Sequence, residues 1–469
     1  MYSMAAHASE GIIASATAIN VKHYTLNQFI TESINAYSAL NIATLNVNKL
    51  ALEIDKVSSQ LGWVATSQGG YSRNASSFGI QTDTIDFGVG LEKPLESGST
   101  VSIEGRYAHA DSEQVLFNLS PNPSDTTNID LNYRIPLLEG NGNQQYQFNT
   151  QKALIDKKIA ELEKEQIREN LVIKLIDIYY LIATIDSRLE TAKKSLERTI
   201  KLRKYIDSNI ELGLLEKGDV FQVDAQIYTL KLEKQKILDL REKQIIAINR
   251  FLNKPFTNEF VIDASSMTLN YRLDSTEKVT SNVIVHDYEI AKLNSRAKLL
   301  DSELELSRNR EKNKLDLVLS VGIQNRTGNS GASSIDDTDT TGMMKFEYRN
   351  ALDKRALSSQ RLQIQIDRET NNEQLATLNK DLKYETYRLL KEVEKSKEIV
   401  ILTKKRTKNE TLKYQDILKR YKNGRSTTNI VIQFDNERIR SELDHETERY
   451  ELAKRINLLM LKQGLLLTQ

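Results

Sequence analysis

The chain has 469 residues and carries almost equal numbers of basic residues (65 Lys and Arg) and acidic residues (64 Asp and Glu). Because no excess of basic charge is left for phosphates, this balance argues against a general polyanion binder such as a nucleic-acid-binding protein. The absence of cysteine excludes disulfides, thiol catalysis, Cys-ligated zinc and a lipid anchor on an N-terminal cysteine.

No run of 18 apolar residues occurs, so the sequence predicts no transmembrane helix. This leaves a transmembrane sheet open, since its strands show only as short alternating segments. Residues 1–23 lack the charged and long apolar parts of a full signal peptide. We expect either a signal remnant, cleaved between "AHA" and Ser9, or a flexible mature N-terminus.

The first half opens with a helical pattern over 24–61, broken near Ser38, and then changes to short alternating runs. Between 62 and 136 the alternation predicts four strands, at 62–72, 84–93, 99–109 and 127–135. In the two clearest strands the apolar residues all share one face: Ile85, Phe87, Val89, Leu91, Ile129, Leu131, Tyr133 and Ile135.

A long helix is predicted at 143–212, since apolar residues recur there at alternating four- and three-residue intervals, as in a coiled-coil seam. A tip at 213–218 interrupts it, and a return helix at 219–253 ends before Pro255. At 1.5 Å per residue the long helix would be about 105 Å long.

The second half repeats this order after a linker at 256–282. Gly424 lies in the place that Gly213 has in the first half, so we expect two tandem repeats, 24–255 and 283–469. The expected elements are a helix at 283–310, strands at 315–323 and 342–349 joined by a polar loop, a long helix at 350–422, a tip at 423–428 and a return helix at 429–466.

These segments together resemble the TolC family of outer-membrane efflux and secretion channels. The resemblance rests on "YTLNQFITESINAYSALNIATLNVNKLALEIDKVSSQ", "DLNYRIPLLEGNG", "IELGLLEKGDVFQVDAQIYTL", "RYKNGRSTTNIVIQFDNERI" and "LAKRINLLMLKQGLLL", in this order over nearly the full length. It implies an α+β membrane protein: a homotrimer with a β-barrel in the outer membrane of a Gram-negative bacterium and a continuous α-helical barrel in the periplasm. It also implies docking to a periplasmic adaptor (membrane fusion) protein and to an inner-membrane transporter of the ABC or RND type.

In this interpretation the apolar face of each strand meets lipid and the polar face meets a water-filled lumen. Pro136 and Gly140 would form the joint between strand and helix. Six strands in each protomer would give about eighteen in a trimer. The usual family protomer gives twelve per trimer, and 84–109 would then be an extracellular hairpin. We favour the hairpin in the barrel wall, because water would penalise its apolar face.

The resemblance also implies roles for residues at the two tips. Gly213, Gly218, Gly424 and Arg425 would dock the adaptor, and a link between Asp219 and Arg425 would close a gate. Asp219 is equally suited to cap the return helix. Ser426 and Asn429 complete the gate candidates, and Ile430 and Gln433 occupy the positions of the family's acidic ring, so a carboxylate ring is not expected.

Other signals support no enzyme and no cofactor or metal site. The Gly-x-Gly at 140–142 lacks the third glycine of a phosphate cradle, since Gln145 takes that place. The five histidines show no ligand spacing, and Asp336, Asp337 and Asp339 fit a solvated loop better than a cation site. The alternative to a passive channel is a soluble coiled-coil scaffold with β inserts.

Overall fold

The structure is a computed structural model, and it describes residues 23–75, 81–113, 121–263, 267, 269, 271–330 and 333–466. The predicted N-terminal segment 1–23 therefore lies outside the described residues, except for His23. The chain divides into two compact units. The first comprises Met1–Ile42, Lys164–Asp287 and Asn379–Gln469, and the second Ala43–Glu163 and Tyr288–Leu378.

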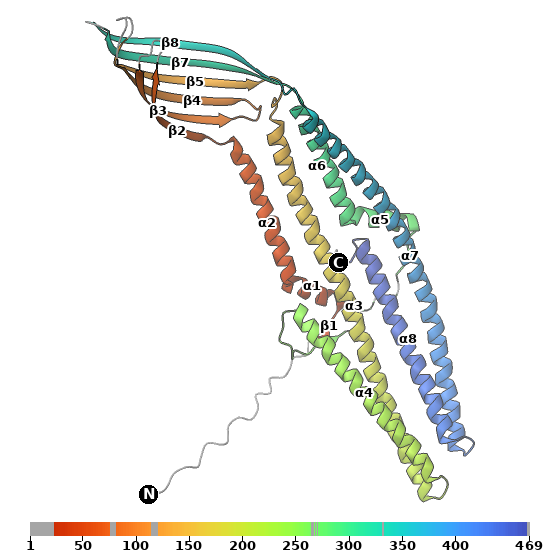
Figure 1. Cartoon of the computed structure of the whole chain (residues 1–469). Helices are drawn as coiled ribbons and strands as arrows, with labels where there is room; N and C mark the ends of the chain where they lie inside the picture. Colours follow the sequence, from red (N-terminus) through yellow and green to blue (C-terminus); the bar gives the residue numbers. More distant parts are fainter. Residues whose placement is uncertain are drawn as a thin grey trace, which may run out of the picture. The chain divides into compact units, whose positions relative to one another are not determined.

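The first unit is helical and contains both helical tips (Figure 1). Its helix α1 begins after Thr25, whose hydroxyl accepts a hydrogen bond from the Gln28 amide while the Gln28 side chain accepts one from the Thr25 amide. This capping box satisfies amide groups that the first helical turn leaves free. The elements of this unit, some of which extend beyond it, are β1 (His23–Tyr24), α1 (Leu26–Ala36), α3 (Gln144–Glu211), α4 (Lys217–Phe251), β6 (Val261–Ile262), α5 (Thr276–His286), α7 (Arg355–Lys422) and α8 (Thr428–Lys462).

The main core of the first unit joins α1, α3, α4 and α8 around buried aromatic rings. The Tyr24 and Phe260 rings stack with centroids 4.6 Å apart, next to the two-stranded parallel sheet of β1 and β6. The Tyr179 hydroxyl donates to the backbone carbonyls of Tyr24 and Asp263. The buried hydroxyl of Tyr179 thus finds its hydrogen-bond acceptors in the segment before α1 and in the segment after α4.

The four long helices of the first unit follow one another in the order α4, α3, α8, α7 (Figure 1). Arg241 of α4 donates to Asp186 of α3 at 2.7 Å. Asn457 of α8 donates to the Tyr180 hydroxyl of α3, also at 2.7 Å. Thr407 of α7 donates to the Ser441 carbonyl of α8 at 2.7 Å. Helix α8 also contacts α4, because Gln226 donates to Asn436 at 2.9 Å.

The second unit contains a six-stranded antiparallel sheet in the order β2-β3-β4-β5-β7-β8 (Figure 1). The helix α2 (Ser38–Ser58), which begins in the first unit, and the short helix η1 (Ser59–Leu61) precede β2, and α6 (Tyr288–Arg310) precedes β7. The strands are β2 (Val64–Ala75), β3 (Gln81–Pro94), β4 (Thr100–Ser112), β5 (Ser124–Pro136), β7 (Lys314–Ser330) and β8 (Ser333–Arg349).

All six predicted strands coincide with strands of the structure, but the predicted loop between the last two is wrong. The sequence predicts a polar loop at 324–341, whereas β7 continues to Ser330 and β8 begins at Ser333. Asp336, Asp337 and Asp339 accordingly lie in β8. Backbone pairing needs no apolar side chain, so the ladder continues where the alternation of hydrophobicity ends.

The helices agree with the expected pattern except around residue 283. The expected break near Ser38 falls between the end of α1 at Ala36 and the start of α2. The single helix expected at 283–310 is wrong, because α5 ends at His286 and α6 starts at Tyr288. Helix α5 also starts inside the expected linker, where the Ser275 hydroxyl caps it by accepting from the Lys278 amide.

Corresponding helices of the two halves have matching lengths. Helices α3 and α7 each have 68 residues, α4 and α8 each have 35, and α1 and α5 each have 11. Among the described helices, none combines the length and the hydropathy that crossing a membrane would require.

Candidate functional site

The first tip is a sharp turn that ends α3 and begins α4. Gly213 has φ +72°, a conformation that favours glycine. Its amide donates to the Ile210 carbonyl at 2.9 Å, and the Leu214 amide donates to the Asn209 carbonyl at 2.8 Å. These two bonds form a Schellman motif, which satisfies carbonyls that the last helical turn would leave free.

The second tip repeats this geometry between α7 and α8. Gly424 has φ +70°. Its amide donates to the Tyr421 carbonyl at 2.9 Å, and the Arg425 amide donates to the Arg420 carbonyl at 2.9 Å. A Cβ added to either tip glycine would meet no atom within 4 Å, so the backbone conformation, and not space, favours glycine at both turns.

Two details of the first tip differ from the sequence expectation. Gly218 lies inside α4 and not in the turn, because α4 already begins at Lys217. Asp219 is not the N-cap: that position belongs to Glu216, whose side chain makes no capping hydrogen bond. Asp219 lies in the first helical turn, where its charge interacts favourably with the amino end of the helix dipole.

The two tips pack against each other through a hydrophobic cluster separate from the main core. Its buried members are Ile206, Val223, Ile227, Tyr421 and Val431. Tyr421 also shares a 2.9 Å hydrogen bond with the buried Thr428 hydroxyl. Burial raises the pKa of the Tyr421 phenol, the Thr428 hydrogen bond lowers it, and the nearby Asp219 charge raises it. Val220, which follows Asp219 in the chain, also packs against this cluster.

The four gate candidates differ in their surroundings. Asp219 is half-buried, whereas Arg425 and Asn429 are exposed. Ser426 is half-buried, and its hydroxyl has no hydrogen-bond partner within the described part of the chain. Between the described Asp219 and Arg425 of one chain there is no ion pair within 4.0 Å, so the gate link remains a prediction.

Sequence reasoning missed an ionic cluster just behind the tips. Asp224 follows Gly213 by eleven residues, and Asp435 follows Gly424 by the same interval. Asp224 accepts from Arg203 at 2.7 Å and its side chain is 38% exposed. Asp435 is only 12% exposed and accepts from Arg438 at 2.9 Å. The recurrence of an aspartate at the same distance from both glycines is the signal that would have identified the pair.

The surfaces of the two tips are chemically different. Around the first tip Leu212, Leu214 and Phe221 are each about 70% exposed. At the second tip the exposed residues are polar or charged, among them Asn423 and Arg425. The same backbone turn thus carries exposed apolar side chains at the first tip and a cationic surface at the second tip.

The sheet of the second unit has one apolar face, formed by residues that pair directly across neighbouring strands. Ile129 pairs with Ile323, and Leu131 pairs with both Ile103 and Val321. Opposite residues of an antiparallel pair point to the same face, so the apolar rows merge across the sheet. Of the predicted lipid-facing residues, Ile85, Phe87, Val89, Leu91, Ile129 and Leu131 are exposed, and Tyr133 and Ile135 are half-buried.

The opposite face of the sheet is polar and carries ion pairs. Arg134 of β5 donates to Asp316 of β7 at 3.0 Å and to Glu347 of β8 at 2.9 Å. Arg106 of β4 donates to Asp86 of β3 at 3.3 Å. A sheet with one apolar and one charged face is suited to separate a hydrophobic phase from water.

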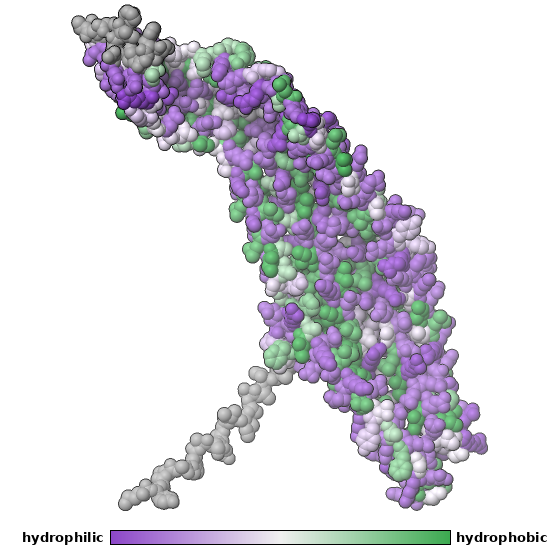
Figure 2. All heavy atoms as spheres, viewed as in Figure 1, coloured by the Kyte–Doolittle hydropathy of each residue, from purple (hydrophilic) through white to green (hydrophobic). Residues whose placement is uncertain are grey.

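Exposed apolar side chains also occur on helix α2. Ile42, Leu45 and Leu52 are each 66% exposed, and Figure 2 shows hydrophobic residues along this helix. Groups of this kind on a monomer commonly mark a surface that another protein covers.

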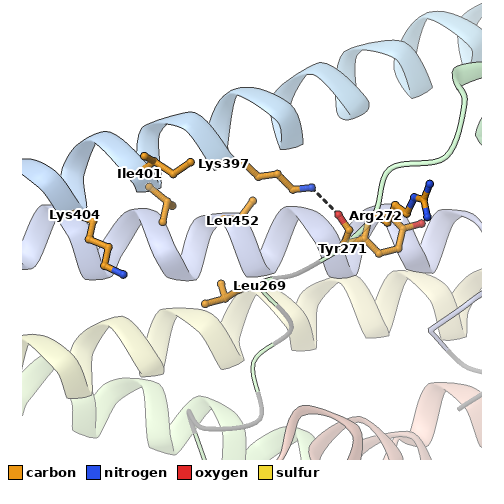
Figure 3. A pocket seen from close by; sticks show the side chains of 8 residues that line it. Leu269, Tyr271, Arg272, Lys397, Ile401, Lys404 and Leu452 are labelled. Atoms are coloured by element: carbon orange, nitrogen blue, oxygen red, sulfur yellow. Dashed lines mark hydrogen bonds between the residues drawn. The ribbon is translucent and has the colours of Figure 1, made fainter.

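A pocket of about 610 Å³ lies between α7, α8 and the segment before α5 (Figure 3). The Lys397 ammonium donates to the Tyr271 carbonyl at 2.6 Å, and Arg272 and Lys404 add two further cations. The described lining contains no carboxylate, and Leu269, Val400, Ile401 and Leu452 supply an apolar floor. Throughout the described residues, no group of three or more His, Cys, Asp or Glu side chains is arranged to hold a metal.

No family model and no curated protein matches the sequence. Solved structures do match over almost the whole chain. The outer-membrane channel OprN is 14% identical, with a TM-score of 0.64 and coverage of 94% of this chain and 89% of that one. VceC, an outer membrane protein of Vibrio cholerae, is 13% identical (TM-score 0.62, coverage 94% and 96%).

CusC, whose crystal structures describe transmembrane channel formation, is 12% identical, with a TM-score of 0.65 and coverage of 97% and 95%. The chain has the fold of these TolC-like outer-membrane channels, which confirms the resemblance predicted from the sequence. At these identities the likeness establishes the fold alone.

Proposed function

We propose that this protein is a passive outer-membrane channel of a Gram-negative bacterium, the exit duct of a tripartite efflux pump or a type I secretion system. The observation that carries the proposal is the two-faced sheet in a chain with an outer-membrane channel fold. Water would penalise the exposed apolar rows of β3 and β5, at about 25 cal/mol for each Å². Lipid removes this cost, while the charged face borders an aqueous lumen.

The free edges of the sheet support an oligomer. Within the described residues, the outermost strands β2 and β8 each pair on one side only, and a lipid bilayer offers no hydrogen bonds to open strand edges. Closure by three copies of the chain satisfies these edges. Exposed Leu45 and Leu52 on α2 offer further apolar surface for the neighbouring copies.

The helical hairpins are suited to the periplasm. Helix α3 has 68 residues and is therefore about 100 Å long, and the equal lengths of α7 and α3 support two tandem repeats of one unit. We assign the docking of a periplasmic adaptor, and through it of an inner-membrane transporter, to the tips. Gly213, Gly218, Gly424 and Arg425 are exposed there.

The fractionation of cells that express the protein tests the proposal. We expect the protein in the outer membrane, as a trimer that needs detergent to stay monodisperse after purification. A protein that stays monodisperse without detergent would instead support the alternative, a soluble coiled-coil scaffold with β inserts. Co-purification of an adaptor and an ABC or RND transporter would establish the assembly and indicate the class of cargo.

A further inference from the structure

We propose that the six strands are one third of an eighteen-stranded barrel, in which β8 of one copy pairs with β2 of the next. The inference rests on the proposed outer-membrane location and goes beyond it in naming the surface that joins the copies. The competing arrangement keeps twelve strands and places residues 84–109 outside the wall.

Strands β3 and β4 are integral parts of the sheet. β3 pairs with β2 from Gln81 to Glu92 and with β4 from Thr82 to Pro94. β4 in turn pairs with β5 from Thr100 to Ala110. An extracellular hairpin would leave one side of β4 without a partner in the wall, whereas here β4 is paired on both sides for nearly its whole length.

The apolar surface also continues through β3 and β4. One ladder row joins Leu91, Ile103, Leu131 and Val321, all of which are exposed on the same face. If β3 and β4 formed a hairpin in water, the apolar side chains that they add to this row would be exposed to water at a cost in free energy. Membrane burial of β3 and β4 explains their side chains in the same way as it explains those of β5 and β7.

The strands are staggered by the amount that a membrane barrel requires. The ladder row through Val64, the first residue of β2, reaches Met343 on β8. β8 continues for six more residues to Arg349, so the strand ends shift by six residues over five pairings. With a rise of about 3.3 Å per residue and strands about 4.8 Å apart, this stagger corresponds to a tilt of about 40°, inside the usual range for outer-membrane barrels.

The two free edges have opposite directions and can pair in an antiparallel manner. β2 starts directly after the helix η1, and β8 ends shortly before α7. Three copies then close an even number of strands without a parallel pair. Through the ladder rows, the apolar face carries the odd-numbered residues of β2 and the even-numbered residues of β8. The seam keeps this face continuous only if odd-numbered residues of β2 lie opposite even-numbered residues of β8.

Only two registers at the seam combine this face rule with a tilt between about 35° and 45°. One places Ser67 opposite Phe346 of the next copy, which makes the total shift six residues for each copy and the tilt about 35°. The other places Ser67 opposite Tyr348, with a shift of eight residues and a tilt of about 43°.

The number of strands sets the diameter of the barrel. At a tilt of about 40°, eighteen strands enclose about 36 Å between opposite backbones, and twelve strands enclose about 24 Å.

Cysteine cross-linking in isolated outer membranes tests the seam, because the chain has no cysteine of its own. Directly opposite residues in a sheet lie within disulfide range. We expect Ser67→Cys combined with Phe346→Cys, or with Tyr348→Cys, to give covalent dimers and trimers on oxidation. Ser67→Cys with Val321→Cys is the matched control, because Val321 is as exposed as Phe346 but lies on β7, which is paired on both sides.

A spin label at Val89→Cys provides a second measurement that does not depend on the register. We expect the label to be accessible to a lipid-soluble quencher. Trimers in the outer membrane that form neither cross-link, with a label accessible only to a water-soluble quencher, would overturn the eighteen-stranded barrel and leave the channel proposal intact. A protein found outside the outer membrane would instead overturn the channel proposal itself.

Discussion

The two helical tips of this protein share one backbone conformation but differ in the chemistry of their exposed side chains. Both turns use a glycine with positive φ and the same pair of amide-to-carbonyl bonds. Leu214 follows the first glycine and Arg425 follows the second. The glycine turn therefore fixes the shape of the tip, while the residues around it set the chemistry of its surface.

The aspartates behind the tips show a second contrast. The Asp224 carboxylate is partly exposed to water beside its partner Arg203. The Asp435 carboxylate is nearly buried between Arg438 and Arg198. Identical residues at equivalent positions therefore carry different energetic weight, because the exclusion of water decides how strongly a charge depends on its partner.

The largest expected effect comes from a bulky residue at either tip glycine. Ala at Gly213 or Gly424 tests backbone strain alone, since open space surrounds both positions, and we expect transport to continue. Trp at the same positions would project into the adaptor surface and abolish transport, with trimers still present in the outer membrane. Drug susceptibility of cells and detection of trimers measure the two properties. Full transport by both Trp variants would contradict docking at the tips.

The contrast between Asp435 and Asp224 predicts different losses of stability when each carboxylate is removed. Asp435→Ala removes two hydrogen bonds from the nearly buried Arg438, which keeps Glu442 as its remaining acidic partner. It should cost about 1.5–3 kcal/mol of unfolding free energy. Asp224→Ala removes a partly solvated pair and should cost about 1 kcal/mol or less. Thermal unfolding of the purified trimer in detergent measures both variants. Equal losses would show that burial does not separate the two sites.

The gate prediction concerns the closed state of the throat. If Asp219 and Arg425 on adjacent tip helices form a charge-assisted hydrogen bond there, each bond contributes about 1 kcal/mol or less, and threefold symmetry repeats it. We then expect higher single-channel conductance for Asp219→Ala and for Arg425→Ala. Unchanged conductance in both variants would leave Asp219 as a helix-dipole partner only.

The smallest effect concerns His445 on α8, which lies 3.1 Å from the Thr403 hydroxyl. Burial lowers the pKa of the His445 imidazole, as do Arg449 and Lys404, while Glu446 raises it. The unfolded chain then binds more protons than the folded one, so stability falls as pH drops through the unfolded value of about 6.5. His445→Gln should reduce the loss of thermal stability between about pH 7.5 and pH 5.5. His286→Gln, which removes an exposed imidazole, is the control.

Several features of this protein follow from local sequence because they depend on local physics. The alternation around Phe87 and Ile129 sets which face of each strand is apolar. The glycines at 213 and 424 mark the turns, because few other residues adopt positive φ without strain. The order of these elements was enough to indicate the fold that the solved structures share.

Only the tertiary structure decided the features that depend on distant partners. Strands β7 and β8 extend through polar residues because each supplies the other with backbone hydrogen bonds, which side-chain patterns do not record. The ion pair between Asp435 and Arg198 joins residues more than two hundred positions apart. The joining of β2, β3 and β4 to β5 in one sheet likewise arises from pairing across the chain. Local alternation determines which face of a strand is apolar. The neighbour of a strand is determined by which other segment of the chain lies beside it in the fold and satisfies its backbone amides and carbonyls.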